Sequence, residues 1–255
     1  MVIGIIGGTG VYDPTWLEDV KEHVVETPYG KTLILEGKLQ KSPASVFFMN
    51  RHGLDHSVPP HLVNYRANLF GLKSLGVDRV VATAAVGSLN RDYIPGTLVV
   101  ADQFLDFTKS RVHTFHQGGP TGVVHTDMTA PYCPAMADVI TAEAERQGIA
   151  VHRGGVYVAT EGPRFETSAE IRAFRMLGGD VVGMTGVPEV VLARELGLCY
   201  NTLALVTNFA AGISSDVLTH QEVLDVMAAH VQHLRSLLLA AVPQLTKPGI
   251  CRCHK

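Results

Sequence analysis

The feature that most constrains the fold is a short apolar segment that runs through a glycine–proline turn into a capped helix start. Residues 155–159, Gly-Val-Tyr-Val-Ala, have the composition of a buried strand. The Gly-Pro pair at 162–163 ends that strand. Thr167 and Glu170 then form a T-x-x-E capping box, which predicts that a helix begins there. This strand–turn–helix unit indicates an α/β fold.

Glu166 lies between this turn and this helix, at the mouth of the expected strand. Ligands of open α/β sheets bind at that rim, so Glu166 is a candidate site residue, although a solvated loop acid is an alternative interpretation. Further strands are expected at 2–6, 45–49, 78–88, 97–107, 180–184 and 198–206, and helices at 61–75, 134–147, from Pro188 and from Thr219-x-x-Glu222. Most of these strands end in glycine or other small residues with polar side chains nearby.

The composition fits one large domain. Of 255 residues, 46% are hydrophobic and 18% are charged, which is enough to bury a sizeable core. No repeat or linker interrupts the chain, so we expect one domain over residues 1–245 and a polar tail at 246–255. A net charge of −3 and the lack of a long apolar run argue against nucleic-acid and membrane partners. No signal peptide is recognised, so a cytoplasmic protein is expected.

The cysteines do not suggest a disulfide framework, because the chain has only four. Cys133 and Cys199 lie in apolar surroundings and are expected to be buried thiols. Cys251 and Cys253 form a C-x-C pair in the polar tail. One such pair offers too few ligands for a structural zinc site, so a frayed tail without a special role is predicted.

Residues 108–132 are expected to form a long loop that contains His113, His116, His125 and Asp127. The spacing of these side chains matches no familiar zinc pattern, so no metal is expected there. A long loop in a compact domain is more often a lid or an oligomer contact.

The first strand ends in Gly7-Gly8-Thr9-Gly10. Backbone N–H groups of such a turn, together with the Thr9 hydroxyl, can form a nest for an anion. A dinucleotide fingerprint is excluded because Asp13 stands at the third glycine position. A P-loop is excluded because no G-K-[ST] follows.

Two other strand ends also offer anion donors. Arg51 and His52 precede Gly53, and Thr185 stands close to a helix start. Each has a simpler interpretation, such as a surface ion pair for Arg51. Because these donors follow separate strands, their convergence at one rim predicts a phosphate site, and the lack of an accompanying metal-binding Asp pair argues against a kinase or ATPase.

Four motifs carry a resemblance to a known family, the trimeric purine nucleoside and methylthioadenosine phosphorylases. The chain resembles this family from Ile3 to about Leu245. The motifs are Gly7-Gly8-Thr9-Gly10, Arg51-His52-Gly53, Glu161-Gly162-Pro163-Arg164-Phe165 and Met184-Thr185-x-Val187-Pro188-Glu189. The resemblance implies a single α/β domain with a mixed, partly barrel-like β-sheet flanked by helices. It also implies a homotrimer or a hexamer of trimers, and phosphorolysis of purine nucleosides with inorganic phosphate as co-substrate and no other cofactor.

The resemblance also assigns site residues. Those matching the phosphate binders are Thr9, Arg51, His52 and Thr185, with the backbone around Ala84 and Ala85. Phe165 matches the aromatic residue on the purine, and Met184 matches the residue under the sugar. Asn208 and Ala210 stand where methylthioadenosine enzymes carry two Asp residues.

At three positions, the residue type resembles that of the 6-oxopurine enzymes and not that of the methylthioadenosine enzymes. These residues are Glu166, Asn208 and His220. An ionised Glu166 only accepts hydrogen bonds, so it suits the N1–H of a 6-oxopurine and not the N1 lone pair of adenine. Asn208 can donate to O6 or N7 and is the candidate for leaving-group activation, with Arg51 and His52 acting on phosphate. His220 matches a histidine near the sugar 5′-hydroxyl. We therefore expect a 6-oxopurine nucleoside phosphorylase of purine salvage; the alternatives are a methylthioinosine or methylthioadenosine phosphorylase, and a catalytically silent purine-nucleoside-binding protein.

Overall fold

The computed structural model describes residues 1–8, 11, 17–40, 45–55, 57–119, 122–214, 218–247, 251 and 253. In this part of the chain eleven strands form one mixed sheet. The strands are β1 (Ile3–Gly7), β2 (Leu17–Thr27), β3 (Gly30–Leu39), β4 (Ser45–Asn50), β5 (Arg79–Ser88), β6 (Leu98–Val100), β7 (Gln103–Phe107), β8 (Val151–Arg153), β9 (Val156–Thr160), β10 (Val181–Gly183) and β11 (Cys199–Phe209). The helices are the 3₁₀ turn η2 (Pro60–Leu62) and α1 (Tyr65–Ser74), α2 (Pro134–Arg146), α3 (Ser168–Met176), α4 (Gly186–Glu195) and α5 (His220–Leu245).

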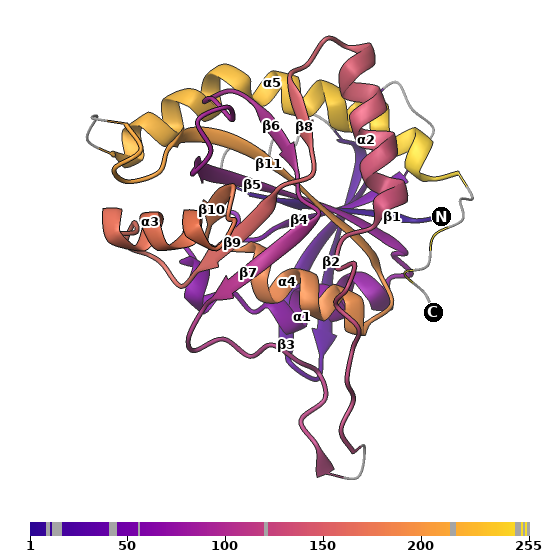
Figure 1. Cartoon of the computed structure of the whole chain (residues 1–255). Coiled ribbons are helices and arrows are strands. Elements are labelled where there is room, and N and C mark those ends of the chain that lie inside the picture. The colour runs from indigo at the N-terminus through magenta and orange to yellow at the C-terminus, as the bar shows by residue number, and fades with distance from the viewer. Residues whose placement is uncertain are drawn as a thin grey trace.

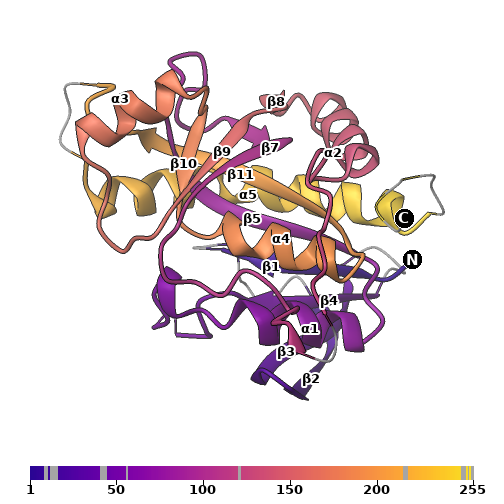
Figure 2. The same ribbon diagram turned by 60° about the horizontal axis from the view of Figure 1, so that its bottom comes forward.

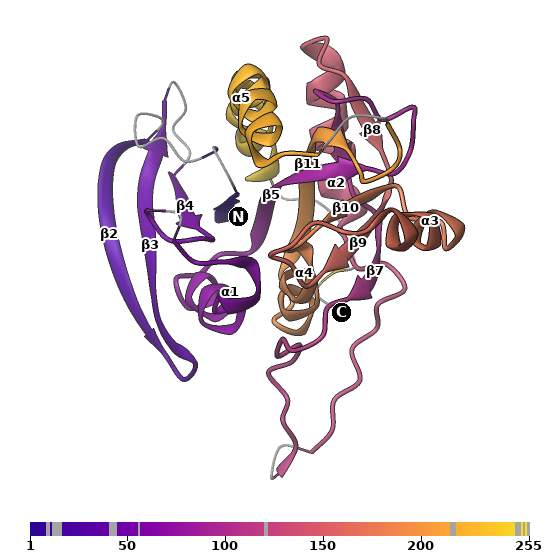
Figure 3. The same ribbon diagram turned by 90° about the vertical axis from the view of Figure 1, so that its left-hand side faces the viewer.

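Helices cover both faces of this sheet, as expected for a single-domain α/β fold with a mixed sheet. Helices α2 and α5 pack together on one face, and α1 and α4 pack on the other (Figures 1 and 3). Each layer buries its own apolar cluster against the sheet. Helix α3 and the beginning of α5 lie at the same end of the molecule (Figure 2). No helix among the described residues combines the length and apolar character needed to cross a bilayer.

Strand β5 holds the sheet together because it pairs with three other strands. Strand β11 runs parallel to β5 along one edge for its whole length. On the other edge, β1 pairs with β5 as far as Ala82, and β10 pairs in the opposite direction with Gly87 and Ser88. Within the described chain, residues 83–86 therefore have no strand partner on that edge. The carboxyl ends of β1 and β10 approach this gap from opposite directions.

Strands β2, β3 and β8 were not predicted from the sequence, and the prediction of a single strand at 97–107 was wrong. Strand β2 carries charged residues on both faces and is mostly exposed, so it lacks the apolar pattern of a buried strand. The 97–107 segment divides after Val100, because β6 pairs with β11 and β8 whereas β7 pairs with β9. The other expected strands and helices are confirmed to within a few residues, and so is the capping box of Thr167 and Glu170.

For Cys251 and Cys253, the interpretation of the tail as frayed was also wrong. Cys253 is only 7% exposed and belongs to the same apolar cluster as α2 and α5, and Cys251 packs against that cluster. Arg194 donates to the backbone oxygen of Cys253 at 3.4 Å. The partners of the C-x-C pair, Cys133 and Cys199, lie far away in the sequence, so no local pattern indicates that the pair is buried.

The 108–132 loop has the form expected from the sequence, since its described residues contain no α-helix or strand and only Gly119 has a 3₁₀ conformation. It projects from the body of the molecule (Figures 1 and 3). Arg111 fastens the base of the loop by donating to the backbone oxygens of Val187, Thr160 and Glu161.

Candidate active site

A cavity of about 320 Å³ lies where β1, β5 and β10 meet. This volume lies at the lower end of the range for small-molecule sites. The sequence-predicted residues that line it are Arg51, His52, Ala84, Ala85, Phe165, Glu166, Met184, Thr185, Asn208, Ala210 and His220. Thr9, the remaining predicted residue, lies outside the described part of the chain. One cavity thus brings together side chains from six separate segments.

Arg51 follows β4 and supplies the buried positive charge of the cavity. Its Nε and Nη2 donate to the two carboxylate oxygens of Glu189 at 2.8 and 2.7 Å, and its Nη1 donates to the Thr83 oxygen at 2.9 Å. Burial alone would lower the pKa of Arg51, but the ion pair with Glu189 raises it above its usual value. A guanidinium has five N–H donors and three are engaged here, so two remain for an anion.

Glu189 pairs with Arg51, a role that was not predicted from the sequence. Its side chain is fully buried, and the Tyr200 hydroxyl also donates to it at 2.7 Å. Pro188-Glu189 was expected only to open a helix. Val187 is indeed extended, so the regular part of α4 begins at Pro188. A buried acid is normally paired, but its partner is 138 residues away and no local pattern identifies it.

Gly8 lets the end of β1 approach β5 closely. Its N–H donates to the Thr83 hydroxyl at 2.9 Å. A Cβ at this position would lie 2.7 Å from the Thr83 backbone oxygen and 3.2 Å from Arg51 Nη1. Only glycine leaves room for the Arg51 guanidinium at this point.

The other predicted phosphate ligands surround the gap in the sheet. Ala84 and Ala85 belong to the part of β5 that lacks a strand partner on the β1 and β10 edge, so their small side chains leave the backbone accessible to a ligand. Thr185 is buried at the N-cap of α4, and its hydroxyl does not cap that helix. His52 Nδ1 lies 2.8 Å from the Val58 oxygen. A carbonyl only accepts, so Nδ1 carries the proton and orients the ring.

A β-bulge places Asn208 in the cavity. Thr207 is an extra residue in β11, because Val206 pairs with Val86 and Asn208 pairs with the next residue, Gly87. Without the bulge, Val206 and Asn208 would point to the same face of the sheet. The extra residue leaves Val206 in the apolar core while Asn208 lines the cavity.

Two hydrogen bonds fix the orientation of the Asn208 amide. Its Nδ2 donates to the Phe209 oxygen at 3.0 Å, and its Oδ1 accepts from the Thr207 hydroxyl at 2.8 Å. One N–H and one lone pair of the amide remain for a ligand. A Cβ at Gly87 would lie 3.2 Å from Nδ2, so glycine at this position leaves room for the Asn208 amide.

Glu166 is separated from Arg51 in the sheet order, since it follows β9 and Arg51 follows β4. The Thr160 hydroxyl donates to its Oε1 at 2.6 Å, which leaves Oε2 for a donor on a ligand. Phe165 beside it is 39% exposed, so an aromatic face is accessible to a planar base. The cavity therefore has cationic donors on one side and a carboxylate with an aromatic ring on the other.

The sugar-facing residues expected from the sequence also lie here. Gly162 has a φ of +66°, and a Cβ on it would lie 2.5 Å from Met184 Sδ. His220 is the first residue of α5, whose N-cap Thr219 accepts from the Glu222 N–H at 3.2 Å. Ala210 is buried and adds apolar surface.

A family model described as the phosphorylase superfamily matches residues 2–243. The chain belongs to the phosphorylase superfamily. It is 56% identical over 253 residues to a probable 6-oxopurine nucleoside phosphorylase of Moorella thermoacetica, covering 99% of this chain and 96% of that protein. It is 49% identical over 257 residues to the 6-oxopurine nucleoside phosphorylase of Pyrococcus furiosus, covering 98% and 96%.

Other relatives within this superfamily carry different names. A probable S-methyl-5′-thioinosine phosphorylase of Methanopyrus kandleri is 50% identical over 254 residues, covering 99% of this chain and 96% of that protein. Among solved structures, the methylthioadenosine phosphorylase of Schistosoma mansoni in complex with adenine has a TM-score of 0.91 at 36% identity, covering 97% and 93%. The phosphorylase fold is therefore shared with enzymes whose names differ in both the base and the sugar substituent.

Proposed function

We propose that this phosphorylase cleaves the 6-oxopurine nucleosides inosine and guanosine, giving free purine and ribose 1-phosphate in purine salvage. The observation that carries the proposal is that one cavity holds the paired Arg51, the Glu166 carboxylate and the oriented Asn208 amide. The two relatives named 6-oxopurine nucleoside phosphorylases, at 56% and 49% identity, support it.

Phosphate binds beside Arg51, His52 and Thr185, with the backbone at Ala84 and Ala85. A phosphate oxygen forms a bond to the anomeric carbon while the bond from that carbon to the purine nitrogen breaks. The electron pair of the broken bond stays on the purine, and the proton lost by hydrogen phosphate balances the proton gained by the base. The phosphate dianion stabilises the positive charge that develops on the sugar, which is differential binding of the transition state.

The base is recognised by Glu166 and Asn208. The free oxygen of Glu166 accepts from N1–H, and the remaining N–H of Asn208 donates to N7 or O6 as negative charge builds on the leaving purine. Adenine presents a lone pair at N1, so it faces the carboxylate without a proton between them. Sites with such pairing discriminate by roughly 10⁴–10⁵.

A second candidate substrate, S-methyl-5′-thioinosine, shares the same base. Leu218 and Val223 line the cavity together with His220, so a 5′ substituent meets apolar carbon as well as a polar ring. The name of the Methanopyrus kandleri relative supports this candidate.

We further propose a homotrimer, or a hexamer of trimers, that acts in the cytoplasm with phosphate as co-substrate and no other cofactor. The projecting 108–132 loop exposes Val123 and Val124, whose fractional exposures are 78% and 46%. Exposed apolar surface of this kind favours an interface between subunits. Light scattering coupled to gel filtration measures the oligomeric mass, and a monomer would refute the proposal.

The central experiment incubates the enzyme with inosine in the presence and absence of phosphate and measures hypoxanthine and ribose 1-phosphate. Phosphate-dependent release of both products is expected. Binding of inosine without turnover would favour the silent nucleoside-binding protein. Cleavage of adenosine or methylthioadenosine as efficiently as inosine would refute the assigned roles of Glu166 and Asn208.

A further inference from the structure

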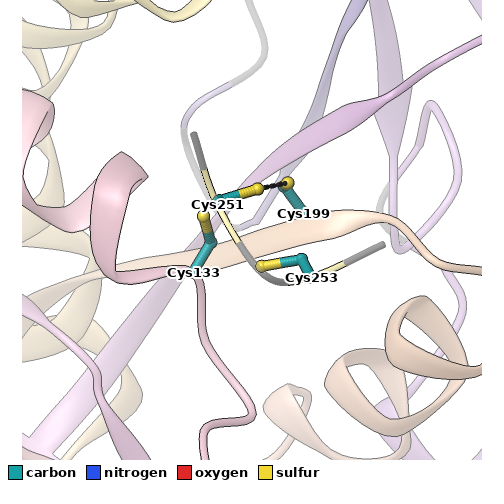
Figure 4. Close-up of side chains that lie close together, drawn as sticks. All are labelled: Cys133, Cys199, Cys251 and Cys253. Carbon is teal, nitrogen blue, oxygen red and sulfur yellow. Dashed lines mark hydrogen bonds between the residues drawn. The ribbon is translucent and has the colours of Figure 1, made fainter. Parts of the chain in front are cut away.

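All four cysteines of the chain meet at one point, far from the candidate active site. The Sγ atoms of Cys133, Cys199, Cys251 and Cys253 lie within 4.8 Å of one another (Figure 4). They come from the N-cap of α2, the first residue of β11 and the C-terminal segment. No disulfide joins any of these four residues, all of which belong to the described chain.

The spacing of the sulfur atoms fits four ligands around one small ion. A tetrahedral Zn²⁺ with Zn–S bonds of about 2.3 Å holds its sulfurs about 3.8 Å apart. Here the Cys199 and Cys251 sulfurs are 3.1 Å apart and the widest pair lies within 4.8 Å, so the observed separations bracket that value. Shifts of about 1 Å or less, which rotamer adjustment can supply, would complete the tetrahedron.

A helix N-terminus and a cation lie beside the four sulfur atoms. Cys133 stands at the N-terminus of α2, where backbone N–H groups stabilise negative charge. The Arg194 cation reaches the same segment through its bond to the Cys253 oxygen. Three of the four cysteines are buried, so solvent has little access to displace an ion.

We propose that Cys133, Cys199, Cys251 and Cys253 form a tetrahedral Cys₄ site for one Zn²⁺ ion. Binding as thiolates releases the thiol protons to solvent and gives a site of net charge −2. The ion has a structural role, because it lies far from the candidate active site. Cys199 and Asn208, which lines that site, are nine residues apart along β11, or roughly 30 Å at about 3.3 Å per residue. It fastens the C-terminal segment to the start of β11 and to α2.

The test uses the full-length chain without an affinity tag, purified anaerobically with a phosphine reductant. Elemental analysis is expected to find about one zinc per chain, as free thiols at this point would be metallated by any available Zn²⁺. Replacement by Co²⁺ is expected to produce the thiolate-to-cobalt charge-transfer absorption and the visible bands of tetrahedral cobalt. Chelation of the wild-type chain is expected to lower its melting temperature.

The variants Cys251→Ser and Cys253→Ser separate the site from the fold, because both lie beyond α5. Loss of a residue that only hydrogen-bonds to a metal ligand typically weakens metal binding roughly 10–100-fold. Each variant removes a ligand itself, so a larger loss of zinc affinity is expected. The control His113→Ala removes a potential ligand in the projecting loop and is expected to retain one zinc per chain.

Each of three results would overturn the proposal. One is a reduced chain that neither contains zinc nor takes up Zn²⁺ or Co²⁺ when these are added. Another is an intact mass showing disulfides among these cysteines in the anaerobic preparation. Equal zinc content in wild type, Cys251→Ser and Cys253→Ser would also overturn it.

Discussion

Replacement of Glu189 by glutamine tests whether a buried carboxylate holds Arg51, the proposed phosphate ligand, in place. The Glu189 carboxylate accepts three hydrogen bonds, two from Arg51 and one from the Tyr200 hydroxyl. Glutamine keeps the size of the side chain but offers a single oxygen and turns N–H groups toward the guanidinium. The side chains of Arg51 and Glu189 are 1% and 0% exposed, so solvent cannot replace the lost charge.

The expected cost follows from this burial. Removing one partner of a buried ion pair typically costs about 3–5 kcal/mol, because the other charge remains buried without compensation. At about 1.4 kcal/mol for each factor of ten, the folding equilibrium shifts by roughly 10²–10⁴. A domain of ordinary stability, about 5–15 kcal/mol, retains about 0–12 kcal/mol after such a loss, so the variant stays folded in water except at the lower limit of this range. A displacement of Arg51 by about 1 Å is expected to lower activity about 10²-fold.

The assay combines urea unfolding with steady-state kinetics at varied phosphate and varied inosine. We expect the Michaelis constant for phosphate to rise and that for inosine to change little, because Glu189 accepts hydrogen bonds from Arg51, the proposed phosphate ligand, and from Tyr200. The matched control is Glu26→Gln, which makes the same chemical change in an ion pair whose Lys31 and Glu26 side chains are 69% and 75% exposed. Exposed pairs contribute about 0–1 kcal/mol.

Two outcomes would refute this reasoning. If Glu189→Gln unfolds at the same urea concentration as Glu26→Gln, the buried pair does not stabilise the fold. If the two Michaelis constants change equally, Glu189 supports the whole cavity and does not specifically position Arg51.

Three other substitutions test separate parts of the site. Asn208→Asp is expected to narrow or reverse the preference for inosine over adenosine, because an ionised carboxylate cannot donate to O6 or N7; unchanged discrimination in competition assays would exclude the amide from base recognition. Gly8→Ala is expected to lower phosphate-dependent turnover about 10²-fold, because its Cβ would lie 2.7 Å from the Thr83 oxygen and would displace Arg51; wild-type kinetics would contradict this steric argument. His220→Val is expected to shift the ratio of inosine to methylthioinosine cleavage toward the methylthio compound, because a thioether is a weak acceptor for the ring; an unchanged ratio would show that His220 does not contact the 5′ position.

The sequence by itself determined the parts of this protein that depend on neighbouring residues. The capping box of Thr167 and Glu170 could be predicted from the sequence because its two hydrogen bonds join residues three positions apart. Most buried strands were recognised from their apolar runs, whereas β2 was missed because an exposed edge strand lacks that pattern. The family motifs placed Arg51, Glu166 and Asn208 as candidates, and each now lines the cavity.

Only the tertiary structure decided how these candidates are held. Arg51 and Glu189 are 138 residues apart, and neither is marked as a partner of the other by any local pattern. The cavity itself depends on β1 and β10 meeting β5 from opposite directions, which is a property of strand pairing and not of any one segment. From the sequence, the C-x-C pair belongs to a polar tail. In the fold, Cys133 and Cys199 lie next to this pair. Such contacts form only when folding brings distant segments together. The residues next to one partner in the sequence therefore do not indicate which residue the other partner is.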